Sequence, residues 1–150
     1  MAPSFKKGTT HMKIRPAFLL KAIGCALLLA SSAAFAAESS TPQAVVTPLM
    51  TKELKDLPGK EALMITVDYP PGSVDPVHRH DAHSFIYVLE GSIVMQVKGG
   101  KEVTLKPGDT FYEGPDDIHT VGRNASRTEP AKFVVVFIKK KGAPVLTPVN

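Results

Sequence analysis

Four histidines in the second half of the chain have the residue type and the spacing of a metal site. His78, His80 and His83 lie close together, and His119 follows in a separate segment. Alternate residues of a β-strand point to the same face, about 7 Å apart along the backbone, so His78 and His80 project together. Two imidazoles from one strand and a third from another can bind one divalent ion. The spacing predicts a metal site on His78, His80 and His119. A His-x-His pair on its own is equally typical of two exposed or hydrogen-bonded histidines at a strand end.

The fourth histidine has a different expected position. Strand alternation places His83 on the face opposite His80, so it would bind the ion only if the strand contained a bulge. We interpret His83 as a surface histidine or as one that supports the ligands, with a metal-binding role as the alternative.

The elements that carry these residues are predicted to be short strands. Apolar and β-branched segments alternate with Gly and Pro, and no i, i+3, i+4 pattern is long enough for a helix. Many short strands with regular turn signals indicate an all-β sandwich or barrel. Tight hairpin turns are expected at Gly91 and at Gly99-Gly100. The expected strands cover residues 62–69, 84–90, 92–98, 103–105, 110–113, 119–123 and 132–138.

Two stretches of this chain resemble the motifs of the cupin superfamily. Gly72 through His78-Arg79-His80 to Gly91 is similar to the first motif, and Pro107-Gly108 through His119 to Asn124 is similar to the second. The resemblance covers residues 63–138 and is that of a single-domain, type-2, exported cupin. It implies a double-stranded β-helix, or jelly-roll barrel, with one metal ion near the bottom of an open mouth.

The chain departs from the cupin motifs at the position of the acidic ligand. Ser84 stands where the family usually has that carboxylate, and by strand alternation it shares the face of His78 and His80. In the second motif Asp117 replaces a glycine, and the spacing from His119 to Asn124 is one residue longer than usual. Two interpretations follow. The three histidines and water hold the metal, as the resemblance to some cupin dioxygenases implies, or the site has lost its metal and is a simple pocket. Retention of all three histidines favours the first.

Other side chains are candidates for the surroundings of the ion. Arg123 would share the face of His119 in a regular strand, where it would favour an anionic ligand. Tyr69 and Tyr112 are candidates for the substrate pocket, with the barrel core as the alternative. Carboxylates that could orient the imidazoles are Asp75, Asp81, Asp116 and Asp117.

The ligand set allows several kinds of chemistry. Three imidazoles around Fe(II) would leave positions open for dioxygenase-like chemistry, whereas Zn(II) would act as a Lewis acid. Ligand types do not distinguish Fe, Zn, Mn, Ni or Cu here. We expect a metal-dependent, oxygenase-like enzyme that acts on a small organic molecule. The alternatives are a non-catalytic, dimeric module that binds a small molecule or a metal, and a structural protein whose barrel edges and N-terminal arm form a homodimer.

The N-terminal residues have the features of a secretory signal. Lys13 and Arg15 precede an apolar run over residues 17–30, and Ala34-Phe35-Ala36 gives a cleavage pattern after Ala36. The run is short for a bilayer span, so we expect no permanent membrane anchor and a periplasmic or secreted protein. The predicted organisation is a signal peptide at 1–36, an N-terminal arm at 37–60, a cupin barrel at 61–141 and a C-terminal tail at 142–150.

Charge and cysteine content follow this division. Five of the 18 Lys and Arg residues and none of the 14 Asp and Glu residues precede Ala37, which leaves a net charge of −1 beyond that point. A nucleic-acid partner is therefore not expected. The one cysteine, Cys25, lies in the predicted leader, so disulfides and thiolate ligands are not expected in the mature protein.

Overall fold

The structure is a computed structural model that describes residues 41–149. The predicted signal peptide, with Cys25, and the first residues of the predicted arm lie outside this range. The described residues form ten strands: β1 (Val45–Glu53), β2 (Lys60–Tyr69), β3 (His78–Arg79), β4 (Ala82–Glu90), β5 (Ile93–Val97), β6 (Val103–Leu105), β7 (Thr110–Glu113), β8 (His119–Asn124), β9 (Ala131–Lys140) and β10 (Thr147–Pro148). No helix within residues 41–149 is long and apolar enough to cross a membrane.

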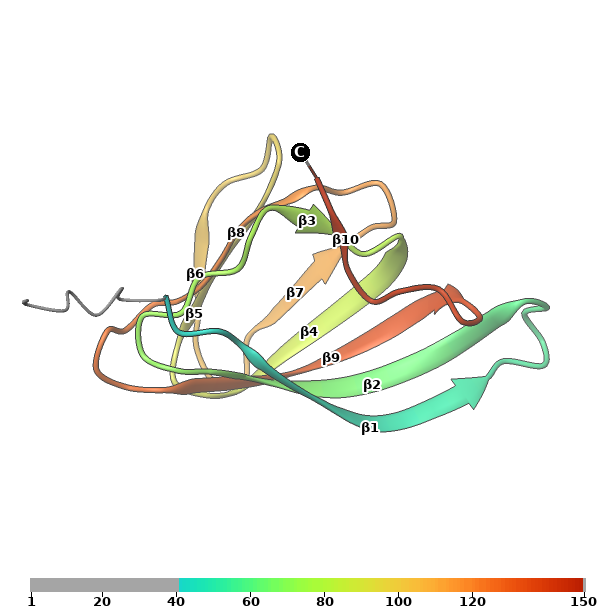
Figure 1. The fold of residues 1–150 in the computed structure, drawn as a ribbon, viewed down its shortest axis with the longest axis horizontal. Coiled ribbons are helices and arrows are strands. Elements are labelled where there is room, and N and C mark those ends of the chain that lie inside the picture. Colours follow the sequence, from blue (N-terminus) through green and yellow to red (C-terminus); the bar gives the residue numbers. More distant parts are fainter. Residues whose placement is uncertain (1–40, 150) are drawn as a thin grey trace, which may run out of the picture. The chain divides into compact units, whose positions relative to one another are not determined.

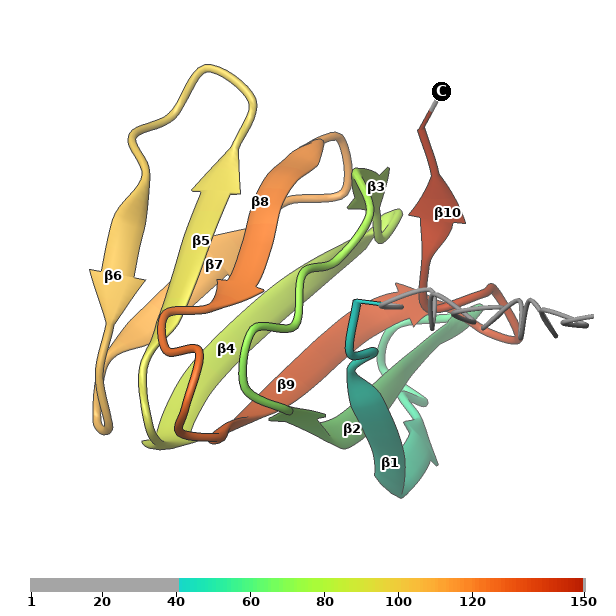
Figure 2. The ribbon, with the colours of Figure 1, turned by 60° about the vertical axis from the view of Figure 1, so that its left-hand side comes forward.

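The strands form two five-stranded antiparallel sheets that face each other (Figures 1 and 2). The first sheet has the order β1-β2-β9-β4-β7, and the second has the order β10-β3-β8-β5-β6. The predicted all-β architecture is confirmed. Strand β1 lies within the segment predicted as an arm, where it pairs with β2 along nearly its whole length. The homodimer expected from the sequence stays a prediction.

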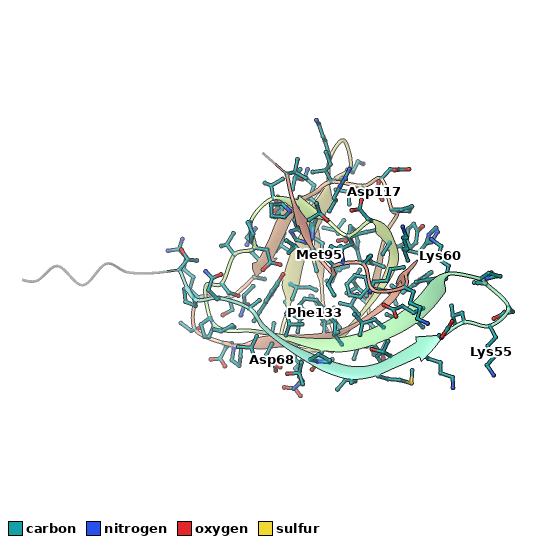
Figure 3. All side chains as sticks on the ribbon, turned by 45° about the vertical axis from the view of Figure 1, so that its right-hand side comes forward. Lys55, Lys60, Asp68, Met95, Asp117 and Phe133 are labelled. Atoms are coloured by element: carbon teal, nitrogen blue, oxygen red, sulfur yellow. The ribbon has the colours of Figure 1, made fainter. Side chains whose placement is uncertain are left out.

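The core lies between the two sheets and follows the alternation of the long strands. Strand β2 buries Leu63, Ile65, Val67 and Tyr69, and β9 buries alternate residues in the same way. Figure 3 shows Met95 of β5 and Phe133 of β9 between the sheets, whereas Lys55 and Asp68 point outward. Each fully buried aliphatic or phenyl side chain stabilises the fold by about 1.5–3 kcal/mol. The resulting rigid double layer carries the histidines at one end of its interior.

The turn at Gly91 differs from the predicted hairpin. Strands β4 and β5 belong to different sheets, so Gly91 carries the chain from one sheet to the other. Gly91 has a φ of 67°, and a Cβ there would lie 2.4 Å from the carbonyl oxygen of Pro130. Only glycine fits both the left-handed conformation and this close approach. The hairpin prediction was wrong because the two strands do not pair with each other: β4 pairs with β7 and β9, and β5 pairs with β6 and β8. The second predicted hairpin, at Gly99-Gly100, joins β5 to β6 and is confirmed.

Candidate metal centre

Three histidines from two chain segments meet on the inner face of the second sheet. His78 begins β3 and pairs directly with His119 at the start of β8, and His80 follows β3 immediately. One ring nitrogen from each of the three lies within 4.8 Å of the other two. His78 and His119 are almost fully buried, and His80 is 13% exposed. The structure therefore brings together the three side chains that the sequence predicted as metal ligands.

Backbone carbonyls fix the orientation of all three rings. Nδ1 of His78 donates to Pro76 O, Nδ1 of His80 to Val145 O and Nε2 of His119 to Val121 O, each over 2.7 Å. A carbonyl can only accept, so each of these outer nitrogens carries the proton. In a neutral imidazole the other nitrogen then presents a lone pair. These inner atoms are Nε2 of His78, Nε2 of His80 and Nδ1 of His119. Carbonyls thus do the orienting that the sequence analysis assigned to aspartates.

Glu113 is a fourth group at this centre, and the sequence analysis did not identify it. Its side chain is only 3% exposed, and it comes from β7 in the opposite sheet. Oε2 lies 3.1 Å from Nε2 of His80, and Oε1 lies 3.2 Å from Nδ1 of His119. The hydrophobic pattern of residues 110–113 marked a strand, but the pattern did not reveal which strand would lie beside it. The pairing of β7 with β4 carries that information.

The charges of these groups are coupled. Burial lowers the pKa of His78. Burial also opposes protonation of His80, but the hydrogen bond with Glu113 and its negative charge outweigh burial and raise the pKa of His80. Burial alone would raise the pKa of Glu113, yet the hydrogen bond from His80 and the neighbouring imidazoles hold it below its usual range. Glu113 is therefore an anion that favours a positive charge beside it.

The arrangement has more acceptors than donors. Three ring lone pairs and a carboxylate converge, and Nε2 of His78 lies 3.2 Å from Nε2 of His80. If His80 is protonated, its Nε2–H can donate to His78 or to Glu113, but within residues 41–149 Nδ1 of His119 has no hydrogen-bond partner. Buried acceptors without donors are costly, and a divalent cation would satisfy all of them at once. The residues present therefore fit a metal ion.

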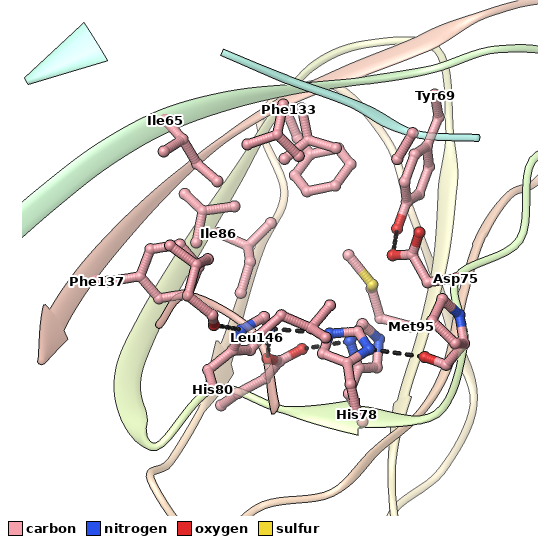
Figure 4. A pocket seen from close by; sticks show the side chains of 18 of the residues that line it. Ile65, Tyr69, Asp75, His78, His80, Ile86, Met95, Phe133, Phe137 and Leu146 are labelled. Carbon is pink, nitrogen blue, oxygen red and sulfur yellow. Dashed lines mark hydrogen bonds and ion pairs between the residues drawn. The ribbon is translucent and has the colours of Figure 1, made fainter. Parts of the chain in front are cut away.

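A pocket of about 360 Å³ opens from the histidines into the space between the sheets (Figure 4). Its walls are mostly aliphatic and aromatic, and among the residues that the structure describes no Lys or Arg belongs to its lining. Apolar lining residues labelled in Figure 4 include Ile65, Ile86, Met95, Phe133 and Phe137. Such a cavity would accommodate a small and largely apolar molecule beside the histidines.

Tyr69 and Asp75 form a polar pair in the lining of this pocket, with Asp75 close to the His119 ring (Figure 4). The Tyr69 hydroxyl donates to Oδ2 of Asp75. Burial, together with the charge and hydrogen bond of Asp75, raises the pKa of Tyr69 far above its ordinary value. Tyr69 therefore stays a protonated donor. The backbone N–H of Asp75 donates to Gly122 O over 2.8 Å, which ties this pair to the strand that carries His119.

The remaining predicted site residues lie elsewhere. His83 points outward from β4, and its Nδ1 is hydrogen-bonded to the Tyr112 hydroxyl over 2.7 Å. Tyr112 is 48% exposed and belongs to the outer face, not to the pocket lining. Ser84 faces inward and is fully buried, but its hydroxyl has no hydrogen-bond partner.

Arg123 is also outside the pocket, and a β-bulge explains its position. Gln96 pairs with Val121 while the next residue, Val97, pairs with His119, so Thr120 is an extra residue in β8. An extra residue reverses the alternation beyond it. Gly122 and Asn124 are consequently buried with His119, whereas the Arg123 guanidinium lies 3.1 Å from Glu102 at the surface.

Comparisons with known proteins agree with this geometry. The family model described as "Cupin domain" matches residues 65–137. These residues form a cupin domain. The match contains all three histidines and Glu113.

One curated relative and two solved structures illustrate the likeness. The chain is 29% identical to the pectin degradation protein KdgF of Dickeya dadantii (strain 3937) over 82 residues, which are 54% of this chain and 71% of that protein. A Klebsiella pneumoniae protein with a double-stranded β-helix domain superposes with a TM-score of 0.57 at 19% identity, over 73% of this chain and 89% of the other. An oxalate oxidase in complex with the substrate analogue glycolate gives a TM-score of 0.56 at 25% identity, over 74% of this chain and 57% of the oxidase. The cupin domain thus has the predicted double-stranded β-helix fold, and the chain spans little more than half of the oxidase.

Proposed function

We propose that this cupin holds one divalent metal ion on His78, His80 and His119 and acts as an oxygenase-like enzyme on a small organic molecule. The observation that carries the proposal is the convergence of three ring lone pairs whose outer nitrogens are all fixed by backbone carbonyls. Such preorganisation is what metal-ligating histidines require. When bound, the ion would supply a Lewis acid or, with a redox-active metal, a site for oxygen chemistry.

The pocket supports a restricted class of ligand. Its apolar walls favour a molecule with a small hydrophobic body, and its lining offers no fixed cation to bind an anionic group away from the centre. A polar end of the molecule would therefore face the histidines. The substrate analogue glycolate in the oxalate oxidase is a small molecule of the size that this cavity could hold.

The protein's own groups have defined roles in this proposal. Pro76, Val121 and Val145 hold the imidazoles in place through their carbonyls. Tyr69 keeps its proton and donates a hydrogen bond to Asp75, so the pair can orient a polar substituent on the side of the pocket next to His119. The closely packed aliphatic side chains exclude water from the rest of the cavity.

A second candidate is a non-catalytic module that binds a small molecule or the metal itself. It is favoured by one observation: the Tyr69 hydroxyl already donates to Asp75, so this pair has little free acid–base capacity. Fold alone does not separate the two candidates, since function depends on the site. From the predicted leader we also propose that the protein acts in the periplasm or outside the cell.

Elemental analysis of protein purified from its native compartment tests the metal. We expect close to one divalent ion per chain, and we expect it to be lost from His78→Ala/His80→Ala. The matched control is His83→Ala, which removes an imidazole from the outer face and should keep the ion. A folded wild-type protein without a stoichiometric ion would contradict the proposal.

Oxygen uptake separates the two candidate functions. The metal-loaded protein is tested against diketones, flavonols and thiols, and consumption of oxygen with one class supports the enzyme. Tight binding without turnover, for every metal loaded, supports the binding module.

A further inference from the structure

Ser84 and Glu113 occupy opposite positions on two neighbouring strands. They are direct partners in the antiparallel pairing of β4 with β7. Both side chains point into the interior, where Ser84 is fully buried and Glu113 is 3% exposed. Directly opposed residues of an antiparallel pair have Cβ atoms about 4.5–5.5 Å apart, so the two side chains enter the same space.

The two residues differ in what they offer to an ion. The Ser84 hydroxyl is short, forms no hydrogen bond and is a poor ligand for a divalent ion. Glu113 extends past it to the histidines, and its two oxygens lie 3.1 and 3.2 Å from the inner nitrogens of His80 and His119.

These distances are those of neighbouring ligand atoms around one ion. Nitrogen and oxygen ligands lie about 2.0–2.2 Å from Zn²⁺, which places adjacent ligand atoms at roughly 3.0–3.5 Å from each other in octahedral or tetrahedral geometry. The inner nitrogens of His78 and His80, 3.2 Å apart, already satisfy this spacing. The two oxygens of Glu113 lie at the same spacing from the inner nitrogens of His80 and His119, so the carboxylate would be a fourth ligand group.

We propose that Glu113 is the carboxylate ligand of this centre and replaces the acidic ligand that position 84 does not supply. The inference rests on the proposed metal site and completes it as a set of three imidazoles and one carboxylate. The short serine side chain at position 84 leaves space for the Glu113 carboxylate. A glutamate there would place a second carboxylate in the space that Glu113 occupies, and two like charges in a buried cross-strand pair are destabilising. The carboxylate can therefore come from β4 or from β7, but not from both.

Titration of the chelator-treated full chain with Zn²⁺ and with Co²⁺ tests this assignment. The variant Glu113→Gln keeps the size of the side chain and one acceptor oxygen but removes the charge, and we expect it to lower Zn²⁺ affinity by at least 10- to 100-fold. Its visible Co²⁺ absorption should also change, since a ligand has been lost. The control Ser84→Ala removes only the unpartnered hydroxyl and should bind within about threefold of wild type.

A reciprocal exchange tests the link between the two positions. Glu113→Ser should lose affinity, and Ser84→Glu combined with Glu113→Ser should regain at least about tenfold of that loss, with circular dichroism confirming the fold of each variant.

An affinity of Glu113→Gln within threefold of wild type would overturn the assignment. A loss of affinity with unchanged Co²⁺ absorption would overturn it too, because Glu113 would then only orient His80. A folded exchange variant that regains nothing would overturn the equivalence of the two positions. In all three cases, Zn²⁺ binding by the wild-type protein would still support the metal site on the three histidines. A folded wild-type protein that binds no Zn²⁺ would instead contradict the proposed function.

Discussion

At the scale of single residues, Gly122 shows how closely the groups around the histidines are packed. A Cβ at this position would lie 2.8 Å from Cε1 of His119 and 3.0 Å from Oδ2 of Asp75. Its backbone conformation does not require glycine, so the constraint is space alone. The missing side chain lets the His119 ring and the Tyr69–Asp75 pair lie against the same strand.

The variant Gly122→Ala should therefore affect the metal more than the fold. The added methyl group would displace the His119 ring, and we expect Zn²⁺ affinity to fall by about tenfold or more while the protein stays folded. Calorimetric titration and thermal unfolding measure the two effects. Gly100→Ala is the matched control, because its Cβ would contact only Val97 at 3.2–3.3 Å, away from the centre. Equal metal affinity in both variants would contradict the steric argument.

At the scale of the elements, the Asn124 side chain connects the end of β8 to neighbouring segments through hydrogen bonds. It is 4% exposed, and its amide nitrogen donates to the carbonyls of Tyr69, Pro70 and Glu129. Its Oδ1 accepts from the N–H of Ser126. The single side chain thus joins the ends of β2 and β8 to the loop that leads into β9.

Replacing this side chain should destabilise the whole domain. Asn124→Ala leaves buried carbonyls without donors, and we expect it to lower the free energy of unfolding by about 2–4 kcal/mol. Urea denaturation followed by circular dichroism measures the change. Gln96→Ala removes an amide that donates to the exposed Gly100 carbonyl, and it should change stability by less than about 0.5 kcal/mol. Similar losses in both variants would show that the buried network is not what stabilises this corner.

The same elements show what the sequence could and could not predict. Strand alternation was enough for the all-β architecture, because it is a local pattern, and the resemblance to the two cupin motifs was enough for the meeting of His78, His80 and His119. The partner strands were not predictable, and for that reason the hairpin at Gly91 was wrong and Glu113 was missed. The prediction for Arg123 assumed a regular strand, whereas the extra residue Thr120 reverses its direction. A bulge of this kind depends on the register with β5, and its one signal in the sequence is the spacing from His119 to Asn124, which is one residue longer than in the cupin motif.

At the scale of the whole molecule, export stays a prediction that depends on residues 1–36. If the leader is cleaved where the Ala34-Phe35-Ala36 pattern indicates, the mature chain begins at Ala37. Mass spectrometry of the intact protein from a periplasmic extract checks this N-terminus. We expect Ala34→Arg/Ala36→Arg to accumulate as the uncleaved precursor. A periplasmic protein that retains the predicted leader would contradict the prediction.

The segment after β9 reaches back over the centre. Val145 accepts the hydrogen bond that fixes His80, Val145 and Leu146 line the pocket, and β10 pairs with the strand that begins at His78. All four proposed ligands are synthesised earlier than this segment, so a ribosome-bound chain that ends before Val145 would contain every ligand but lack the carbonyl that orients His80. We therefore expect tight metal binding only after translation has passed Val145. The compartment in which the complete polypeptide folds then determines which ion is bound.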